Sequence, residues 1–229
     1  MVGSLKWLRE IGVELGPQVT ENAARSGDLE TLKWVREIGC PWSSTTFGHA
    51  AEKGGWEVLT WLKEQGCPWG DGAIWGAAEN GRIDVAKWLR EQGCPWDRTS
   101  CRIAARAGHF EMVKWLKEQG CPGIEDVLSV ACRGGFLDVA IWAKENGCYA
   151  RLDDIKFCRL AAEGGHLKTL KWLREQGFPW DCATTYGAAC LGHSDVFFWA
   201  VENGCPLGPG KAASTNKRLI QPETEQVSK

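Results

Sequence analysis

Four histidines and eleven cysteines are the residues of this chain that most often act as catalytic groups or metal ligands. Three of the histidines, His109, His166 and His193, occupy one recurring position directly after a glycine. No serine or cysteine lies in a recognisable nucleophile motif. We therefore interpret these histidines as hydrogen-bonding groups at helix starts, and we predict no catalytic residue.

The segment Cys190-Leu191-Gly192-His193, with Cys182 and Cys205 nearby, contains the residue types that bind zinc. Cys205, however, belongs to a periodic row of cysteines, and Cys190 stands at an ordinary helical position. We therefore predict no metal site and no cofactor site.

The periodic row consists of Cys40, Cys67, Cys94, Cys121, Cys148 and Cys205. Equivalent positions of neighbouring helical units lie about 8–10 Å apart, whereas a disulfide requires Cα atoms within about 7 Å. The row therefore cannot pair with itself along a stack, and the odd total agrees. We expect buried thiols in a reducing compartment, either cytoplasmic or nuclear. The N-terminus has no apolar secretory core, so we do not expect secretion.

The element that positions these residues is a repeat whose period is marked by tryptophans. Trp7, Trp34, Trp61, Trp88, Trp115 and Trp142 follow at intervals of 27 residues, and Trp172 and Trp199 resume that spacing after one interval of 30. Repeats of fixed period stack, because one unit cannot bury its apolar face alone. We interpret this tryptophan row as the contact between stacked repeats.

Residues 96–122 illustrate the unit, with one predicted helix over 99–107 and a second over 110–119. Glycine ends both helices by adopting the left-handed conformation that closes the last turn. The glycines after the first helix are Gly27, Gly54, Gly81, Gly108, Gly135, Gly165 and Gly192. An Ala-Ala pair at the centre of most first helices allows close helix packing. We predict seven complete helical hairpins.

The segment Thr99–Gly120 follows the pattern T-x-x-x-x-A-A-x-x-G-H-x-E-x-V-K-x-L-x-x-x-G and resembles the ankyrin repeat. The likeness recurs over residues 1–207, in a Trp-rich form with K-W-L-x-E-x-G-C-P-W. Family repeats are about 33 residues long, and the shortfall lies where the family has its β-hairpin fingers. The resemblance implies an all-α, ankyrin-like solenoid with short Cys-Pro-Trp turns in place of fingers. It also implies that the first helices line the concave face.

The pattern divides the chain into a half repeat with a second helix only (1–16), seven repeats (17–208) and a polar tail that we expect to be mobile (209–229). Because terminal repeats are normally capped by polar residues, we expect a truncated array at the N-terminus, with an unusual natural cap as the alternative. Three extra residues fall in the turn Cys148–Asp154, which we interpret as a neutral loop insertion.

A second tryptophan row, Trp42, Trp69, Trp96 and Trp180, lies in the turns. It is either an exposed aromatic ladder for ligands or a cover for the gap left by the missing fingers. We favour the second interpretation, because a residue repeated in most units serves the repeat interface more simply.

Positions that vary between repeats are better binding candidates, since stacking does not dictate them. One first-helix column reads Gly48, Trp75, Arg102, Ser129, Arg159 and Tyr186, and another reads Glu52, Glu79, Arg106, Arg133, Glu163 and Cys190. Arg98, Arg102 and Arg106 are four residues apart and share a helical face. The predicted partner-binding residues are Trp75, Arg98, Arg102, Arg106, Arg133 and Arg159, with scattered, solvated arginines as the alternative interpretation.

We predict a non-catalytic, monomeric scaffold that binds another protein with an acidic surface through the first-helix face. The net charge of -2 argues against nucleic acid, and no apolar run is long enough to span a membrane. One alternative is binding of nucleic acid or an acidic ligand through the arginines. Another is a recognition module cut from a larger enzyme.

Overall fold

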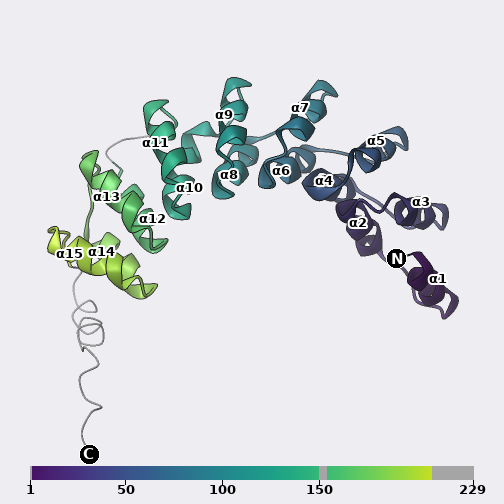
Figure 1. Cartoon of the computed structure of the whole chain (residues 1–229), viewed down its shortest axis with the longest axis horizontal. Coiled ribbons are helices and arrows are strands. Elements are labelled where there is room, and N and C mark those ends of the chain that lie inside the picture. Colours follow the sequence, from purple (N-terminus) through teal and green to yellow (C-terminus); the bar gives the residue numbers. More distant parts are fainter. Residues whose placement is uncertain (1, 150–153, 208–229) are drawn as a thin grey trace, which may run out of the picture. The chain divides into compact units, whose positions relative to one another are not determined.

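The computed structural model describes residues 2–149 and 154–207, and over these residues the chain divides into two compact units after Ile124 (Figure 1). The first unit contains α1 (Val2–Glu10), α2 (Pro17–Ser26), α3 (Leu29–Glu37), α4 (Ser44–Lys53), α5 (Trp56–Glu64), α6 (Asp71–Glu79), α7 (Ile83–Glu91), α8 (Arg98–Arg106) and α9 (Phe110–Glu118). After a short 3-10 turn (Ile124–Asp126), the second unit contains α10 (Val127–Gly134), α11 (Leu137–Glu145), α12 (Lys156–Glu163), α13 (Leu167–Glu175), α14 (Cys182–Cys190) and α15 (Ser194–Glu202).

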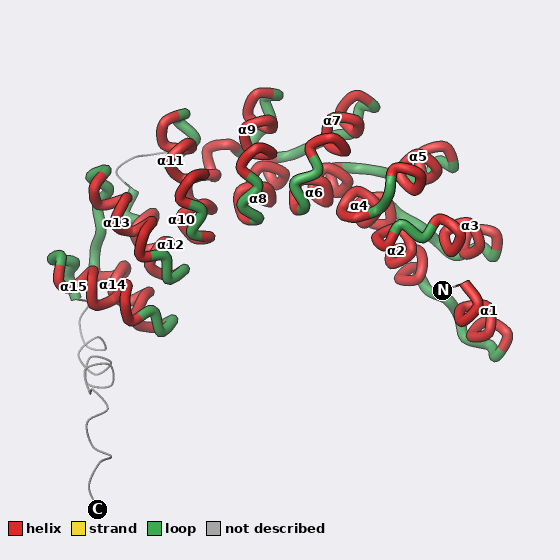
Figure 2. The backbone as a smooth tube through the Cα atoms, in the orientation of Figure 1, coloured by secondary structure: helices red, strands yellow, loops and turns green. Residues whose placement is uncertain are grey.

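Each unit is a stack of helical hairpins in two layers (Figure 2). The even-numbered helices from α2 onward form the first-helix layer, and the odd-numbered helices form the second-helix layer. No strand occurs in the part of the chain that the structure describes, so the predicted all-α solenoid is confirmed. The tail 209–229 and residues 150–153 of the inserted turn lie outside the described residues, and the three-part division of the chain stays a prediction.

The hairpin of α8 and α9 begins and ends with local hydrogen bonds. The Asp97 carboxylate accepts a hydrogen bond from the Thr99 N–H and thereby caps α8. At the end of α9, Gly120 has φ +73°, and the N–H of Cys121 donates to the Leu116 carbonyl. This left-handed glycine satisfies carbonyls that would otherwise lack partners.

Gly54 is the exception among the glycines that end first helices. Its φ is −63° and its ψ is 154°, so the left-handed conformation predicted for it is wrong. A Cβ atom here would lie 2.7 Å from the carbonyl oxygens of both Ala24 and Ala50. Glycine is therefore required at this position for the close approach of α2 and α4, and not for a positive φ.

The core lies between the two layers and between neighbouring hairpins. The alanine pairs of the first helices are buried, as in Ala104 and Ala105, although Ala189 in the last hairpin is half-buried. The second helices contribute fully buried aliphatic residues such as Leu32 and Val35. First helices pack closely against one another, whereas second helices lie further apart. Each unit therefore curves toward its first-helix layer.

Tryptophans from the turns bridge the wider spacing between second helices. The Trp96 ring lies 4.0 Å from the Arg90 guanidinium of α7 and packs edge-on against Trp115 of α9, with ring centroids 6.0 Å apart. The same arrangement recurs at Trp42, Trp69 and Trp180. The turn row therefore covers the gap left by the missing fingers, which confirms the interpretation that it serves the repeat interface.

The tightest contact between first helices lies between α4 and α6, where Gly76 faces the Gly48 carbonyl. A Cβ atom on Gly76 would come within 2.4 Å of that oxygen. We predict that Gly76→Ala destabilises the chain by about 1–3 kcal/mol, because the clash outweighs the higher helix propensity of alanine.

The matched control is Gly72→Ala in the same helix, where the nearest atom to a new Cβ is 4.0 Å away. Urea unfolding followed by circular dichroism measures both variants, and we expect the control to be neutral or more stable than wild type. Equal midpoints for the two variants would show that the α4–α6 contact is not tight.

Candidate protein-binding surface

Three arginines follow one face of α8, one on each turn. Arg98, Arg102 and Arg106 are all exposed. Their spacing of four residues places their side chains above one another along the helix. The structure therefore brings together three of the predicted binding residues on a single element.

Trp75 of α6 lies beside the start of α8 and is half-buried. Its indole Nε1 donates a hydrogen bond to the Asp97 carboxylate at 2.8 Å. Burial alone would raise the pKa of Asp97, but hydrogen bonds from Thr99 and Trp75 outweigh it and hold that pKa below its ordinary value. Trp75 therefore joins two neighbouring first helices and offers only its remaining surface to a partner.

Arg106 pairs loosely with Glu79 of α6 across the repeat interface. The closest nitrogen–oxygen distance is 3.4 Å, and the two side chains are 68% and 51% exposed. Ion pairs this exposed contribute about 0–1 kcal/mol to stability. Arg102 takes part in no ion pair among the described residues. We call Trp75, Arg98, Arg102 and Arg106, with Glu79 beside them, the Arg surface.

Arg133 and Arg159 belong to the second unit and are not part of the Arg surface. Both approach Glu163, with distances of 2.9 Å from Arg133 and 3.6 Å from Arg159. The Glu163 side chain is 26% exposed, which places this cluster at the rim of the first-helix layer. The predicted arginines thus lie in two separate groups. In the second group the Glu163 carboxylate offsets part of the positive charge of Arg133 and Arg159.

A polar network between α2 and α4 was not among the predicted sites. The Nε atom of Arg25 donates to the Glu52 carboxylate at 2.8 Å, and its Nη2 lies 2.6 Å from Nδ1 of His49. The same His49 nitrogen lies 2.9 Å from Glu52. Thr45 donates to Glu21 at the edge of this network. These side chains provide hydrogen-bond partners for one another, and because they come from α2 and α4, the network links two neighbouring repeats.

Opposite charges at equivalent positions of successive repeats are the sequence signal for these contacts. The charged positions read Arg25, Glu52, Glu79, Arg106, Arg133 and Glu163, and the structure pairs them two by two in that order. Reading the column as consecutive couples of opposite charge, with Arg25 included, would have identified the ion pairs.

The recurring histidines serve the interface between first helices. The Nε2 atoms of His109, His166 and His193 hydrogen-bond the backbone carbonyls of Glu79, Arg133 and Glu163 at 2.8–3.0 Å. Each imidazole lies at the start of a second helix and contacts the end of the preceding first helix. A hydrogen-bonding role at the helix start is thus confirmed for these three residues.

All eleven cysteines lie within the described residues and are thiols, and nine of them are buried. Within most hairpins the row cysteine points toward the start of the first helix, as where the Cys94 thiol donates to the Gly70 carbonyl at 3.2 Å. Burial raises the pKa of Cys94 to about 11, which makes it a poor nucleophile at neutral pH. Cys190 is exposed, and no group of three metal-ligating side chains occurs in the described residues.

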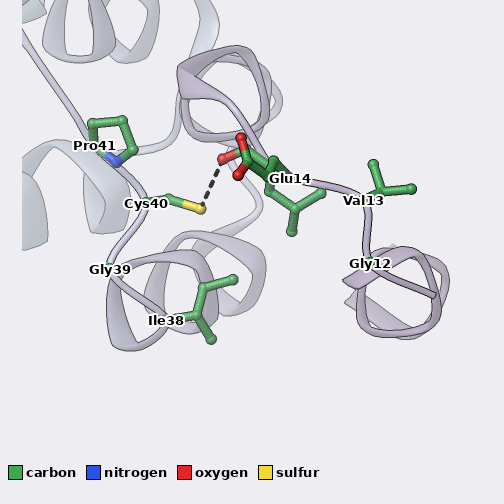
Figure 3. Close-up of a pocket in the computed structure, with 8 residues that line it drawn as sticks. Gly12, Val13, Glu14, Ile38, Gly39, Cys40 and Pro41 are labelled. Carbon is green, nitrogen blue, oxygen red and sulfur yellow. Dashed lines mark hydrogen bonds between the residues drawn. The ribbon is translucent and has the colours of Figure 1, made fainter. Parts of the chain in front are cut away.

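A cavity of about 490 Å³ lies between the turn that follows α1 and the turn that follows α3 (Figure 3). Its lining is mostly backbone and aliphatic, and Glu14 is its one charged residue. The Cys40 thiol donates to the Leu15 carbonyl at 3.5 Å across it. The cavity thus presents one carboxylate and one thiol that is hydrogen-bonded to the backbone.

Comparison with known proteins agrees with this architecture. Residues 74–116 match the family model of ankyrin repeats in many copies. That segment is therefore similar to ankyrin repeats. The crystal structure of the human ASB11 ankyrin repeat domain is similar, with a TM-score of 0.55 at 20% identity over 70% of this chain and 84% of that one. No curated protein matches the sequence.

Ankyrin-repeat domains are generally protein–protein interaction modules and are typically non-catalytic. At 20% identity the likeness to the solved domain shows the fold alone. None of the described helices combines the length and apolarity needed to cross a membrane.

We predict that Glu52→Gln lowers stability at pH 7 by roughly 1 kcal/mol, the upper end for a partly exposed ion pair. Burial would raise the pKa of Glu52, but hydrogen bonds from His49 and Arg25 outweigh it and hold that pKa below its ordinary value. Because the pKa of Glu52 is lower in the folded chain than in the unfolded chain, the ionised carboxylate stabilises the fold at pH values above the unfolded-state pKa. This stabilisation is lost as the pH falls through the folded-state pKa.

Urea midpoints measured from pH 7 down through the acid range test this pH dependence. The difference between wild type and Glu52→Gln should shrink on acidification. Glu37→Gln, at an exposed position of α3, is the matched control. If both variants shift the midpoint equally at pH 7, the network contributes nothing specific.

Proposed function

We propose that this chain is a non-catalytic scaffold that binds another protein through its first-helix layer, with the Arg surface as the main contact. The observation that carries the proposal is a contrast between positions. Residues repeated in most units, such as the tryptophan and histidine rows, are engaged in packing between hairpins. Arg102 and Arg106 occupy positions that differ from repeat to repeat, and both stay exposed.

The partner that suits this surface carries clustered carboxylates. Guanidinium groups bind carboxylates with two parallel hydrogen bonds, and arginine and tryptophan are common anchors of protein interfaces. The long, exposed pair with Glu79 leaves Arg106 able to exchange one carboxylate for another at little cost. Arg102 meets a partner without breaking any ion pair formed among the described residues.

The overall charge favours a protein partner over nucleic acid. Neutralising many phosphates requires a continuous basic surface, whereas this chain has a net charge of -2 and places Glu79 within the cluster. We propose a reducing compartment, cytoplasmic or nuclear, and a monomeric chain as the setting for this interaction.

We predict that replacing Arg102 and Arg106 together with alanine weakens binding of an acidic peptide by about tenfold or more. The probe is a short fluorescein-labelled oligoglutamate peptide, and fluorescence anisotropy gives its Kd. The matched control is Lys33→Ala with Lys87→Ala, which removes the same charge from exposed positions of the second-helix layer.

Helicity by circular dichroism should be unchanged in both double variants. Equal affinity of the arginine variant and the lysine control would contradict the proposed surface. Tighter binding of a DNA duplex than of the peptide, falling steeply with salt, would instead favour nucleic acid.

A further inference from the structure

Two thiols meet inside the hairpin formed by α8 and α9. Cys101 lies on α8 and is fully buried, and Cys121 directly follows α9 and is 4% exposed. The Cys101 Sγ lies 4.0 Å from the Cys121 carbonyl oxygen, and the Cys121 Sγ lies 3.6 Å from the Asp97 carbonyl oxygen at the start of α8. The two side chains therefore approach within the same small region of the core.

This hairpin is the one repeat in which both positions are cysteine. The residues equivalent to Cys101 and Cys121 in the other hairpins are Thr20 and Cys40, Phe47 and Cys67, Ile74 and Cys94, Leu128 and Cys148, Cys158 and Phe178, and Thr185 and Cys205. Cys158 has the same orientation as Cys101, since its Sγ lies 3.9 Å from the Phe178 carbonyl oxygen. In these two hairpins the first-helix side chain therefore lies against the residue that follows the second helix, and only in the hairpin of α8 and α9 are both residues cysteine.

The reactivity of this pair differs from that of its neighbours. The hydrogen bond from Cys101 lowers the pKa of Cys121, although burial acts in the opposite direction. In the preceding hairpins burial raises the pKa of Cys67 to about 12 and that of Cys94 to about 11. The thiolate is the nucleophile in disulfide exchange. Cys121 is therefore a better nucleophile than Cys67 or Cys94.

We propose that Cys101 and Cys121 form a reversible disulfide when the chain meets a low-molecular-weight disulfide such as oxidised glutathione. The Cys121 thiolate attacks one sulfur of oxidised glutathione, forming a mixed disulfide and releasing one glutathione thiolate. Cys101 then attacks the Cys121 sulfur, which forms the internal bond and releases the second thiolate. The two cysteine protons pass to the two released glutathiones, so one disulfide is reduced as the other forms.

The bond would alter the start of α8. The reduced Cys121 thiol donates to the Asp97 carbonyl at 3.6 Å, and the Asp97 side chain caps α8 and accepts from Trp75. Disulfide formation removes the donor to that carbonyl. The inference itself needs no partner and is independent of the proposed function.

Peptide mapping of the native full-length chain after treatment with oxidised glutathione tests the proposal. The reaction is quenched with acid, the chain is unfolded and alkylated, and trypsin with a glutamyl endopeptidase then releases residues 99–102 and 119–125 as single-cysteine peptides. We expect these two peptides to be recovered joined by a disulfide, with the loss of two alkylated cysteines, and to separate again on reduction.

Two controls make the outcome decisive. Peptide 157–159, which carries Cys158 opposite Phe178, should be recovered alkylated. In Cys101→Ser the second step is blocked, so glutathione should remain attached to Cys121. Recovery of both wild-type peptides in alkylated form, or joined to other cysteines instead, would overturn the proposal. Absence of glutathione from Cys121 in the variant would overturn attack by that residue.

Discussion

A two-helix hairpin of this size leaves an apolar face that only the next hairpin can cover, and most of the structure follows from that constraint. Within each unit, first helices meet through alanines and glycines, closely enough that Gly76 faces the Gly48 carbonyl without room for a side chain. Second helices are spaced more widely. The gap between them is filled by a turn tryptophan that packs against a second-helix tryptophan and against a cation, as Trp96 does with Trp115 and Arg90. The turn indoles thus lie between second helices, where longer ankyrin repeats have their fingers.

The same constraint explains why so few residues remain for binding. Histidines at helix starts reach back to the preceding hairpin, and opposite charges pair across it, as in Arg25 with Glu52. Even Trp75, at a position that varies between repeats, donates to Asp97 of the next hairpin. On α8, Arg102 takes part in no such ion pair among the described residues, and Arg106 is 68% exposed in its long pair with Glu79, which is why these two residues carry the proposed function.

The fold is predictable from the sequence because the residues that determine helix packing recur at the same position in several repeats. The tryptophan period, the glycine rows and the alanine pairs each specify a helix boundary or a buried face, and the described residues agree with nearly all of them. The conformation of Gly54 was predicted wrongly because a glycine can be required either for a positive φ or for close helix packing. Only the short distance to the Ala24 carbonyl shows that close packing is the reason here.

The site is less predictable, since it depends on which side chains meet across a repeat. Arg106 and Glu79 are 27 residues apart, and their pairing requires the lateral register of α6 and α8. The meeting of Cys101 and Cys121 likewise depends on how one hairpin closes. The division of the chain into two units, which separates Arg133 from Arg106, has no signal in the period.

Backbone amide chemical shifts of the isotope-labelled chain, recorded while the oligoglutamate peptide is added, show which residues meet the peptide. The exposed arginines of α8 should bind it, whereas the residues buried between repeats should not. We expect shift changes concentrated in Arg98–Arg106 and around Glu79, with α3, α5 and α7 unaffected. Changes concentrated on those second helices would contradict binding through the Arg surface.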